Sequence, residues 1–176
     1  MNRISKDEYY MNIAREVTGR STCFRARHGA LIVKNDQIIS TGYVGAPRKT
    51  KDCLERGTCL RNELGIPSGQ RYEMCRSVHA EQNAIINAAR SGANILGGTI
   101  YLYSEKINNN KEFEITEALP CFICKKMIIN AGLEKLVSNT PSGIKIYNLS
   151  EWVDDWQKND LLDDVSVYGE KIKNKS

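Results

Sequence analysis

Two short motifs in the chain carry residue types that can bind a metal ion and move a proton. His79 and Glu81 stand two positions apart, and Cys121 and Cys124 stand three positions apart, directly behind Pro120. Imidazole and thiolate are ligands that zinc prefers, and a catalytic zinc keeps three protein ligands and one open position. Positions i and i+3 of a helix share one face, so both cysteines can reach one ion. These residues predict a catalytic zinc site with His79, Cys121 and Cys124 as ligands.

The carboxylate next to the ligands indicates which chemistry the site would perform. Zinc makes bound water acidic enough to be a nucleophile near neutral pH. Glu81 would lie beside that water, without binding the metal, and carry protons to a leaving group. A redox pair of cysteines is an alternative, but it leaves His79 and Glu81 unexplained. His-x-Glu followed by Pro-Cys-x-x-Cys is the signature of zinc-dependent base deaminases, so the residues favour hydrolytic deamination.

Both motifs fall where the sequence predicts the start of a helix. The segment 79–92 reads as a helix that ends near Gly92, and Pro120 opens a second helix that Gly132 closes. A buried strand is expected over 98–104, between the two helices. We therefore expect two helix starts to converge on one ion.

The remaining segments predict one α/β domain over residues 1–176. An N-terminal helix begins at the capping-box residues Ser5 and Glu8, and 29–43 reads as a β-hairpin around Asn35-Asp36. Alternating strands and helices imply a three-layer α/β/α sandwich. The other expected segments are an elaborated loop 44–78, a polar excursion 104–119, short strands at 135–139 and 143–149, a final helix from Ser150 and a frayed tail from about 169.

The composition is typical of a globular cytoplasmic protein. The chain has 176 residues, of which 41% are hydrophobic and 26% charged, and its net charge is +4. No apolar run approaches the roughly 18 residues that span a bilayer, and the N-terminal segment lacks the apolar core of a secretory signal. We expect no membrane partner, and the mild charge gives no reason to expect a nucleic acid. Because cytoplasmic thiols stay reduced, the six cysteines favour metal binding or catalysis over disulfides.

Beyond the two motifs, the chain resembles the deoxycytidylate (dCMP) deaminase family over about residues 5 to 140, and in particular its bacterial late-competence-type branch. The stretches that carry the resemblance are RSTCFRARHGALIV (20–33), STGYVGAPR (40–48), CLRNELGIPSG (59–69), CRSVHAEQNAIINAAR (75–90) and PCFICKKMIINAGLEKLV (120–137). The resemblance implies a cytidine-deaminase-like fold with a mixed central sheet of about five strands. It also implies conversion of dCMP to dUMP and ammonia.

The resemblance further assigns roles to residues and partners. Zinc would be held by His79, Cys121 and Cys124, Glu81 would shuttle protons, and the backbone N–H of Ala80 would contact the pyrimidine carbonyl. Family members are often hexamers that dCTP activates and dTTP inhibits. Further substrate-binding candidates are the residues of the Gly-Tyr-Val-Gly turn and nearby arginines that could meet a phosphate: Tyr43, Val44, Arg25 and Arg48.

Three departures from the family pattern leave the substrate open. Val44 stands where the family usually has an asparagine that can hydrogen-bond a sugar, and His28 stands where it usually has valine. A lone histidine at a strand start is more typical of a surface or packed side chain. The excursion 104–119 is longer than expected and could overhang the pocket, or be a solvated loop. The alternatives are a deaminase of another nucleotide, nucleoside or base, and a zinc-stabilised competence-type protein that has lost its activity.

Four cysteines remain outside the catalytic motif: Cys23, Cys53, Cys59 and Cys75. Some family members hold a second, structural zinc with ligands from these regions, and a closed site of four thiolates is structural in character. Such a site would brace the loop 44–78. The alternative is four reduced cysteines, some of them buried as small hydrophobic residues.

Overall fold

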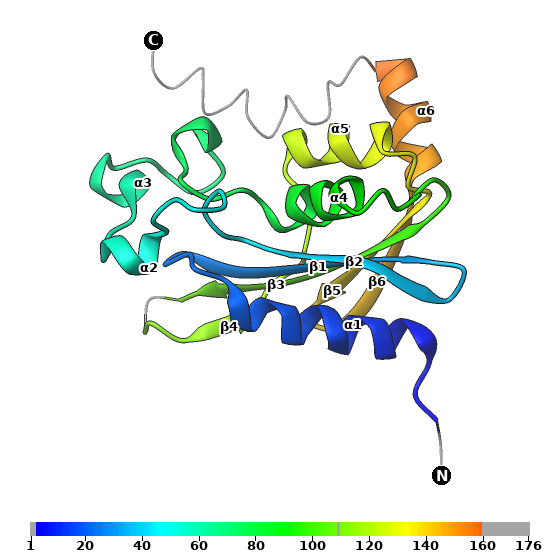
Figure 1. Cartoon of the computed structure of the whole chain (residues 1–176), viewed down its shortest axis with the longest axis horizontal. Coiled ribbons are helices and arrows are strands. Elements are labelled where there is room, and N and C mark those ends of the chain that lie inside the picture. Colours follow the sequence, from blue (N-terminus) through cyan, green and yellow to red (C-terminus); the bar gives the residue numbers. More distant parts are fainter. Residues whose placement is uncertain (1–2, 109, 160–176) are drawn as a thin grey trace.

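The computed structural model describes residues 3–108 and 110–159 (Figure 1). The helices are α1 (Lys6–Val17), α2 (Cys53–Arg56), α3 (Leu60–Glu63), α4 (Ala80–Arg90), α5 (Phe122–Asn130) and α6 (Leu149–Asn159), with 3-10 turns η1 (Thr18–Arg20) and η2 (Tyr72–Met74). The strands are β1 (Ala26–Lys34), β2 (Gln37–Tyr43), β3 (Thr99–Ile107), β4 (Phe113–Ile115), β5 (Lys135–Thr140) and β6 (Gly143–Asn148). The expected frayed tail lies outside the described residues.

A mixed sheet of six strands forms the centre of the fold. The order is β2-β1-β3-β5-β6, and β4 pairs with the far end of β3. Only β3 and β5 run parallel among the described strands, and every other pair is antiparallel. The main path has the expected five strands, and β4 is added because the polar excursion continues β3 and folds back on it.

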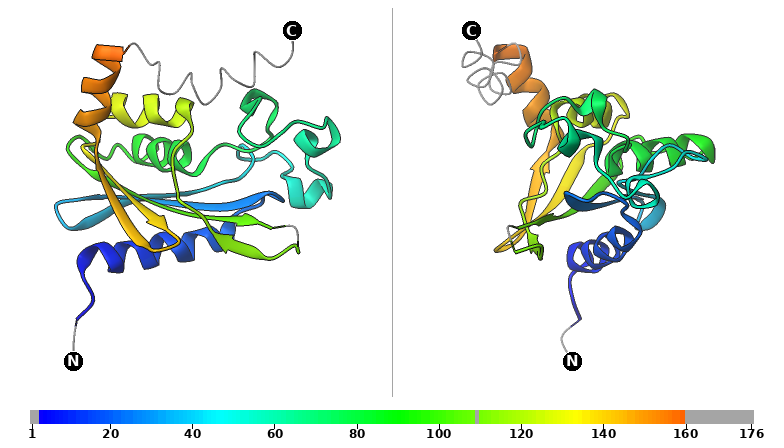
Figure 2. Two further views of the ribbon diagram at one scale, coloured as in Figure 1. Left: turned by 180° about the vertical axis from the view of Figure 1, so that it is seen from behind. Right: turned by 90° about the vertical axis from the view of Figure 1, so that its left-hand side faces the viewer.

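Helices cover both faces of the sheet, as the three-layer prediction requires. The helix α1 lies on one face, and α4 and α5 lie side by side on the other (Figures 1 and 2). Side chains alternate along β1 accordingly: Leu31 and Val33 pack in the α1 layer, whereas Ala30 and Ile32 pack in the α4 layer. The two hydrophobic cores therefore hold the sheet between helices. No helix within the described residues has the length and apolar character needed to cross a membrane.

The helix α4 packs unusually closely on the sheet. Its sheet-facing residues Ala80, Ala84 and Ala88 are fully buried, at i, i+4 and i+8. Opposite them in β2 stands Gly42, where an added Cβ would lie 2.2 Å from the carbonyl oxygen of Ala80. The small alanine side chains and Gly42 let the backbone of α4 lie close to β2. This close contact fixes the distance between the start of α4 and the sheet.

Two predicted loops have ordered local structure. The hairpin between β1 and β2 turns at Asn35 and Asp36, which both have positive φ, as a two-residue hairpin turn requires. The loop 44–78 holds only the short elements α2, α3 and η2, as expected. Figure 1 shows this segment at one end of the sheet, where it closes over the ends of β1 and β3.

Candidate active site

The starts of α4 and α5 bring the two sequence motifs together. His79 is the N-cap residue of α4 and Cys121 is the N-cap residue of α5, with Cys124 one turn later. The Nδ1 atom of His79 lies 3.4 Å from the Sγ atom of Cys121 and 3.4 Å from that of Cys124. The three donor atoms all lie within 4.8 Å of one another. Donors of a tetrahedral zinc stand about 3.6 Å apart, so the three residues fit the ion.

The charges around these donors favour a cation. The hydrogen bond from Cys124 lowers the pKa of Cys121, and His79 acts in the same direction, whereas the same bond and burial raise the pKa of Cys124. Burial lowers the pKa of His79, but the hydrogen bond with Cys121 and the charge of Glu81 outweigh it and leave the pKa raised. An environment that stabilises a positive charge on His79 also suits a metal ion. Helix N-termini further stabilise the thiolate form, which is the form that binds metal.

Glu81 stands beside the three donors in the first turn of α4. Its side chain is only 5% exposed, and burial raises the pKa of its carboxyl group above the usual range. The donor group itself consists of His79, Cys121 and Cys124 alone. A buried carboxyl group with a raised pKa is suited to take and return a proton. The three expected metal ligands thus form one donor group, and Glu81, the expected proton carrier, lies beside this group without belonging to it.

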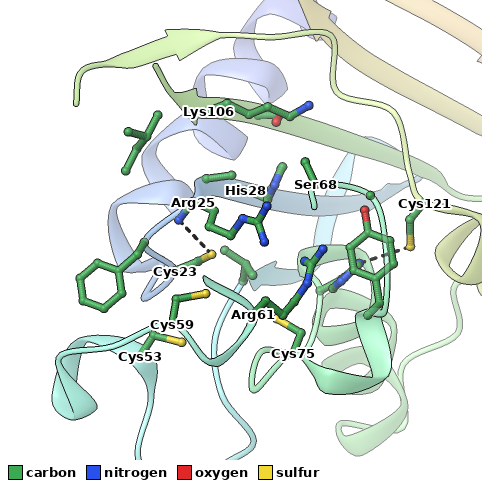
Figure 3. Close-up of a pocket in the computed structure, with 18 of the residues that line it drawn as sticks. Cys23, Arg25, His28, Cys53, Cys59, Arg61, Ser68, Cys75, Lys106 and Cys121 are labelled. Carbon is green, nitrogen blue, oxygen red and sulfur yellow. Dashed lines mark hydrogen bonds between the residues drawn. The ribbon is translucent and has the colours of Figure 1, made fainter. Parts of the chain in front are cut away.

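The donor group opens into a cavity of about 740 Å³ (Figure 3). Its wall includes His79, Glu81 and Cys121 at one end. The excursion also contributes to the wall, with Ser104, Lys106, Ile107, Glu117 and Leu119. Part of this segment therefore reaches the pocket, while Lys106, Glu117 and Leu119 are also exposed to solvent.

Unpaired positive charges gather in the same cavity. Arg25 and Arg61 direct their guanidinium groups into it, and Lys106 joins them from β3 (Figure 3). Within the described part of the chain, none of the three forms an ion pair with a carboxylate. Arg25 donates to the carbonyl oxygen of Ile66 at 3.1 Å. A cavity lined by a metal-ligand set and by cations that have no carboxylate partner among the described residues suits an anionic ligand.

The other predicted substrate-binding residues are divided between the cavity and its surroundings. Val44 lines the cavity, whereas Tyr43, Ala80 and Arg48 do not. Arg48 instead donates to the Asn87 side chain at 2.7 Å. The backbone N–H of Ala80 lies in the first turn of α4, and its contact with a pyrimidine remains a prediction.

The four remaining cysteines all line one part of the cavity. Cys53 and Cys59 are buried, and the sulfur atoms of Cys23 and Cys75 face the same region (Figure 3). Their proximity affects the pKa of Cys23. Burial raises this pKa, and the electrostatic effects of nearby Cys75 and Cys59 raise it further. Among the described residues, however, only His79, Cys121 and Cys124 have donor atoms gathered at metal-binding separations.

Arg61 was not singled out from the sequence, although it connects the loop 44–78 to the metal-ligand candidate His79. It is 6% exposed and donates to the carbonyl oxygens of Pro67 at 2.9 Å and Gln70 at 2.6 Å. Its guanidinium carbon lies 4.9 Å from the ring centroid of Tyr72, and that ring meets the imidazole of His79 edge-on at 4.8 Å. Arg61 thus braces the loop segment that holds the ring of His79.

Asn139 is a second residue that sequence reasoning missed. It is 3% exposed, and its Oδ1 accepts from the N–H of Ser104 at 2.8 Å. Its Nδ2 donates to the carbonyl oxygens of Ser104 at 3.1 Å and Thr116 at 3.2 Å. Its own carbonyl oxygen accepts from the N–H of Ala118 at 2.9 Å. Asn139 on β5 therefore holds both ends of the excursion together. The last residue that it bonds, Ala118, lies three positions before Cys121.

Comparison with known proteins identifies the family. The sequence model described as the cytidine and deoxycytidylate deaminase zinc-binding region matches residues 4–140. The chain belongs to this family. The matched range spans His79, Glu81, Cys121 and Cys124, and a zinc-binding family agrees with a donor group that could hold a metal.

Several relatives in the family are deoxycytidylate deaminases. The enzyme of Mycobacterium phage D29 is 33% identical over 142 residues, which cover 78% of this chain and 96% of the phage protein. The Schizosaccharomyces pombe enzyme is 31% identical over 138 residues, but the match spans only 38% of its length. ComE operon protein 2 of Bacillus subtilis is 30% identical over 134 residues, covering 76% of this chain and 59% of that protein.

A solved structure supports the fold. The dCMP deaminase of cyanophage S-TIM5, determined in complex with dCMP and dUMP, is 28% identical and superposes with a TM-score of 0.53. The match covers 77% of this chain and 82% of the phage protein.

Proposed function

We propose that this chain is a zinc-dependent hydrolase that converts dCMP to dUMP and ammonia. The observation that carries the proposal is the meeting of His79, Cys121 and Cys124 at the starts of α4 and α5, with buried Glu81 beside them. The names of the relatives and the nucleotides bound by the S-TIM5 enzyme support a deoxycytidine nucleotide as substrate.

The roles of the chain's own residues follow from this geometry. Zinc held by the three ligands would supply the Lewis acid that acidifies the attacking water. Glu81 would take one proton from that water, whose oxygen adds at C4 of the pyrimidine, and pass it to ring atom N3. It would then move the second proton from the new C4 hydroxyl to the 4-amino group, which leaves as ammonia while C4 becomes a carbonyl carbon. Its raised pKa suits both halves of the transfer.

The cations of the cavity support a phosphorylated substrate. Arg25, predicted from the sequence as a phosphate ligand, lines the cavity without a carboxylate partner among the described residues. Lys106 lines the same wall. With the base at the metal, a 5′-phosphate would extend toward these side chains. Turnover of dCMP, dCTP, deoxycytidine and cytidine, measured side by side, tests this assignment.

The substitution Glu81→Gln tests the mechanism. We expect kcat for dCMP to fall by a factor of about 100 to 10,000, the usual effect of removing a general acid–base. Zinc content should stay unchanged, because Glu81 is not among the three donors. Glu16→Gln, an exposed change on α1, is the matched control. A fully active Glu81→Gln enzyme, or wild-type protein without bound zinc, would refute the mechanism.

A second, structural zinc at Cys23, Cys53, Cys59 and Cys75 is also part of the proposal. Its support is that all four line one part of the cavity. Binding would require the sulfur atoms to close onto one ion. Zinc analysis should then give two ions per chain in the wild type and one in Cys53→Ser. One ion in both proteins would leave only the catalytic site.

Self-association and regulation stay predictions from the family resemblance. A hexamer is expected, with activation by dCTP and inhibition by dTTP. Light scattering of the purified chain and dCMP kinetics with each nucleotide would test them.

A further inference from the structure

Three neighbouring strands place a row of side chains across the floor of the cavity. The N–H of Val44, just past β2, donates to the carbonyl oxygen of His28 on β1 at 3.1 Å. His28 in turn pairs across the sheet with Ser104 on β3. Val44, His28 and Ser104 all line the cavity that contains His79, Glu81 and Cys121. His28 is therefore the central residue of the row.

His28 is also the member of the row whose hydrogen-bonding groups are left for a ligand. Val44 has no polar side-chain atom, and the hydroxyl group of Ser104 lies 3.3 Å from that of Thr116. The backbone N–H and carbonyl groups of His28 are bonded to Ser21 and Val44. Its imidazole makes no hydrogen bond to any residue that the structure describes. A partly buried polar ring without a protein partner is the hydrogen-bonding group that a ligand would meet there.

The surroundings of His28 keep its ring uncharged. Burial lowers the pKa of His28 to about 4, and the electrostatic effects of His79 and Lys106 act in the same direction. A neutral imidazole carries one donor and one acceptor, whereas guanidinium and ammonium groups only donate. A hydroxyl group likewise both donates and accepts. The ring is therefore matched to a hydroxyl, while Arg25, Arg61 and Lys106 are matched to an anion.

We propose that His28 binds the sugar hydroxyl of the nucleotide substrate and is a specificity-determining residue of this pocket. The inference rests on the proposed function, because it takes the pyrimidine to lie at the metal ligands and the phosphate near Arg25 and Lys106. The sugar joins these two groups, and His28 lines the same cavity as His79 and Lys106, both of which act on it electrostatically. In dCMP the 3′-hydroxyl is the one free hydroxyl of the sugar, so it is the partner that His28 selects.

The test compares dCMP with 2′,3′-dideoxy-CMP, which lacks only that hydroxyl. We expect the wild type to prefer dCMP in kcat/KM by about tenfold or more, since a site built to bond a hydroxyl rejects the analogue without it. In His28→Val the preference should fall to about one, through loss on dCMP alone. His28→Gln, which keeps a donor and an acceptor, should retain part of the preference. Melting temperature and zinc content identify any variant that fails to fold.

Three results would overturn the inference. The first is an equal preference in wild type and His28→Val, and the second is a wild type without preference. The third is a His28→Val enzyme that no longer prefers dCMP over deoxycytidine but still prefers dCMP over 2′,3′-dideoxy-CMP. That result would mean that His28 contacts the phosphate and not the sugar hydroxyl. Calorimetric binding of dCMP and 2′,3′-dideoxy-CMP to Glu81→Gln, with and without His28→Val, gives the same ratio without turnover. Failure of the proposed reaction is thus distinguishable from failure of this inference.

Discussion

Replacing Asn139 by leucine should destabilise the folded chain far more than a typical asparagine substitution. Leucine has a similar volume but cannot make the three side-chain hydrogen bonds to Ser104 and Thr116. Each bond contributes about 1 kcal/mol net, and a buried group left without a partner costs about 1 to 3 kcal/mol. The free energy of unfolding should therefore fall by about 3 to 5 kcal/mol, a large part of the roughly 5 to 15 kcal/mol of a typical domain.

The loss of these hydrogen bonds should also affect the metal site, because the residues that Asn139 holds, Thr116 and Ala118, lie just before Cys121 in the chain. We expect faster zinc release to a chelator from Asn139→Leu than from the wild type. Urea unfolding at one fixed free-zinc concentration measures the stability change, since a ligand bound to the folded state shifts it. The control is Asn148→Leu, whose exposed side chain bonds Glu151 alone among the residues that the structure describes, at 3.2 Å. A loss below about 1 kcal/mol, the mean for any substitution, would refute the reasoning.

Three further substitutions probe other supports of the site. Gly42→Ala should lower stability by about 1 to 3 kcal/mol through overpacking, because its Cβ would meet backbone atoms of α4, whereas Gly19→Ala, with open space around it, should be nearly neutral in thermal unfolding. Arg61→Lys should weaken zinc affinity by roughly tenfold or more in chelator competition, while the same change at exposed Arg56 should have no effect. His28 has its folded pKa lowered to about 4 from 6.5, so its contribution to stability is complete above pH 6.5 and is lost as the pH falls toward 4; acid unfolding of His28→Gln should lack this component, which is at most about 3 kcal/mol.

The sequence predicted the elements whose signals are local. The starts of α4 and α5, the hairpin turn at Asn35-Asp36 and the capping box at Ser5 all follow from residues within a few positions of each other. The three donors could be predicted for the same reason, because each motif opens a helix. Only the convergence of the two helices depends on the sheet between them.

The residues that were missed act over long distances in the chain. Asn139 bonds Ser104, which is 35 positions away, and nothing in a short strand pattern reveals such a bond. The polar excursion was not predicted as a strand because β4 is only three residues long and pairs with an extension of β3. His28 was expected to be a surface or packed residue, since its place in the cavity depends on which strands lie beside β1.

The alanine face of α4 has a consequence for how firmly the Glu81 carboxylate is held. Alanine has no side-chain rotamers, so the contact of α4 with the sheet loses almost no side-chain entropy on folding and has no alternative packing to enter. Larger side chains at Ala80, Ala84 and Ala88 would have given this contact several arrangements with different helix heights. The backbone position of Glu81 is therefore fixed by this close contact, together with the bonds from Asn83 and Asn87 to β2. Heating the protein cannot displace the backbone of Glu81 through rotamer changes of these alanines. Only a movement of the whole helix α4 would displace it.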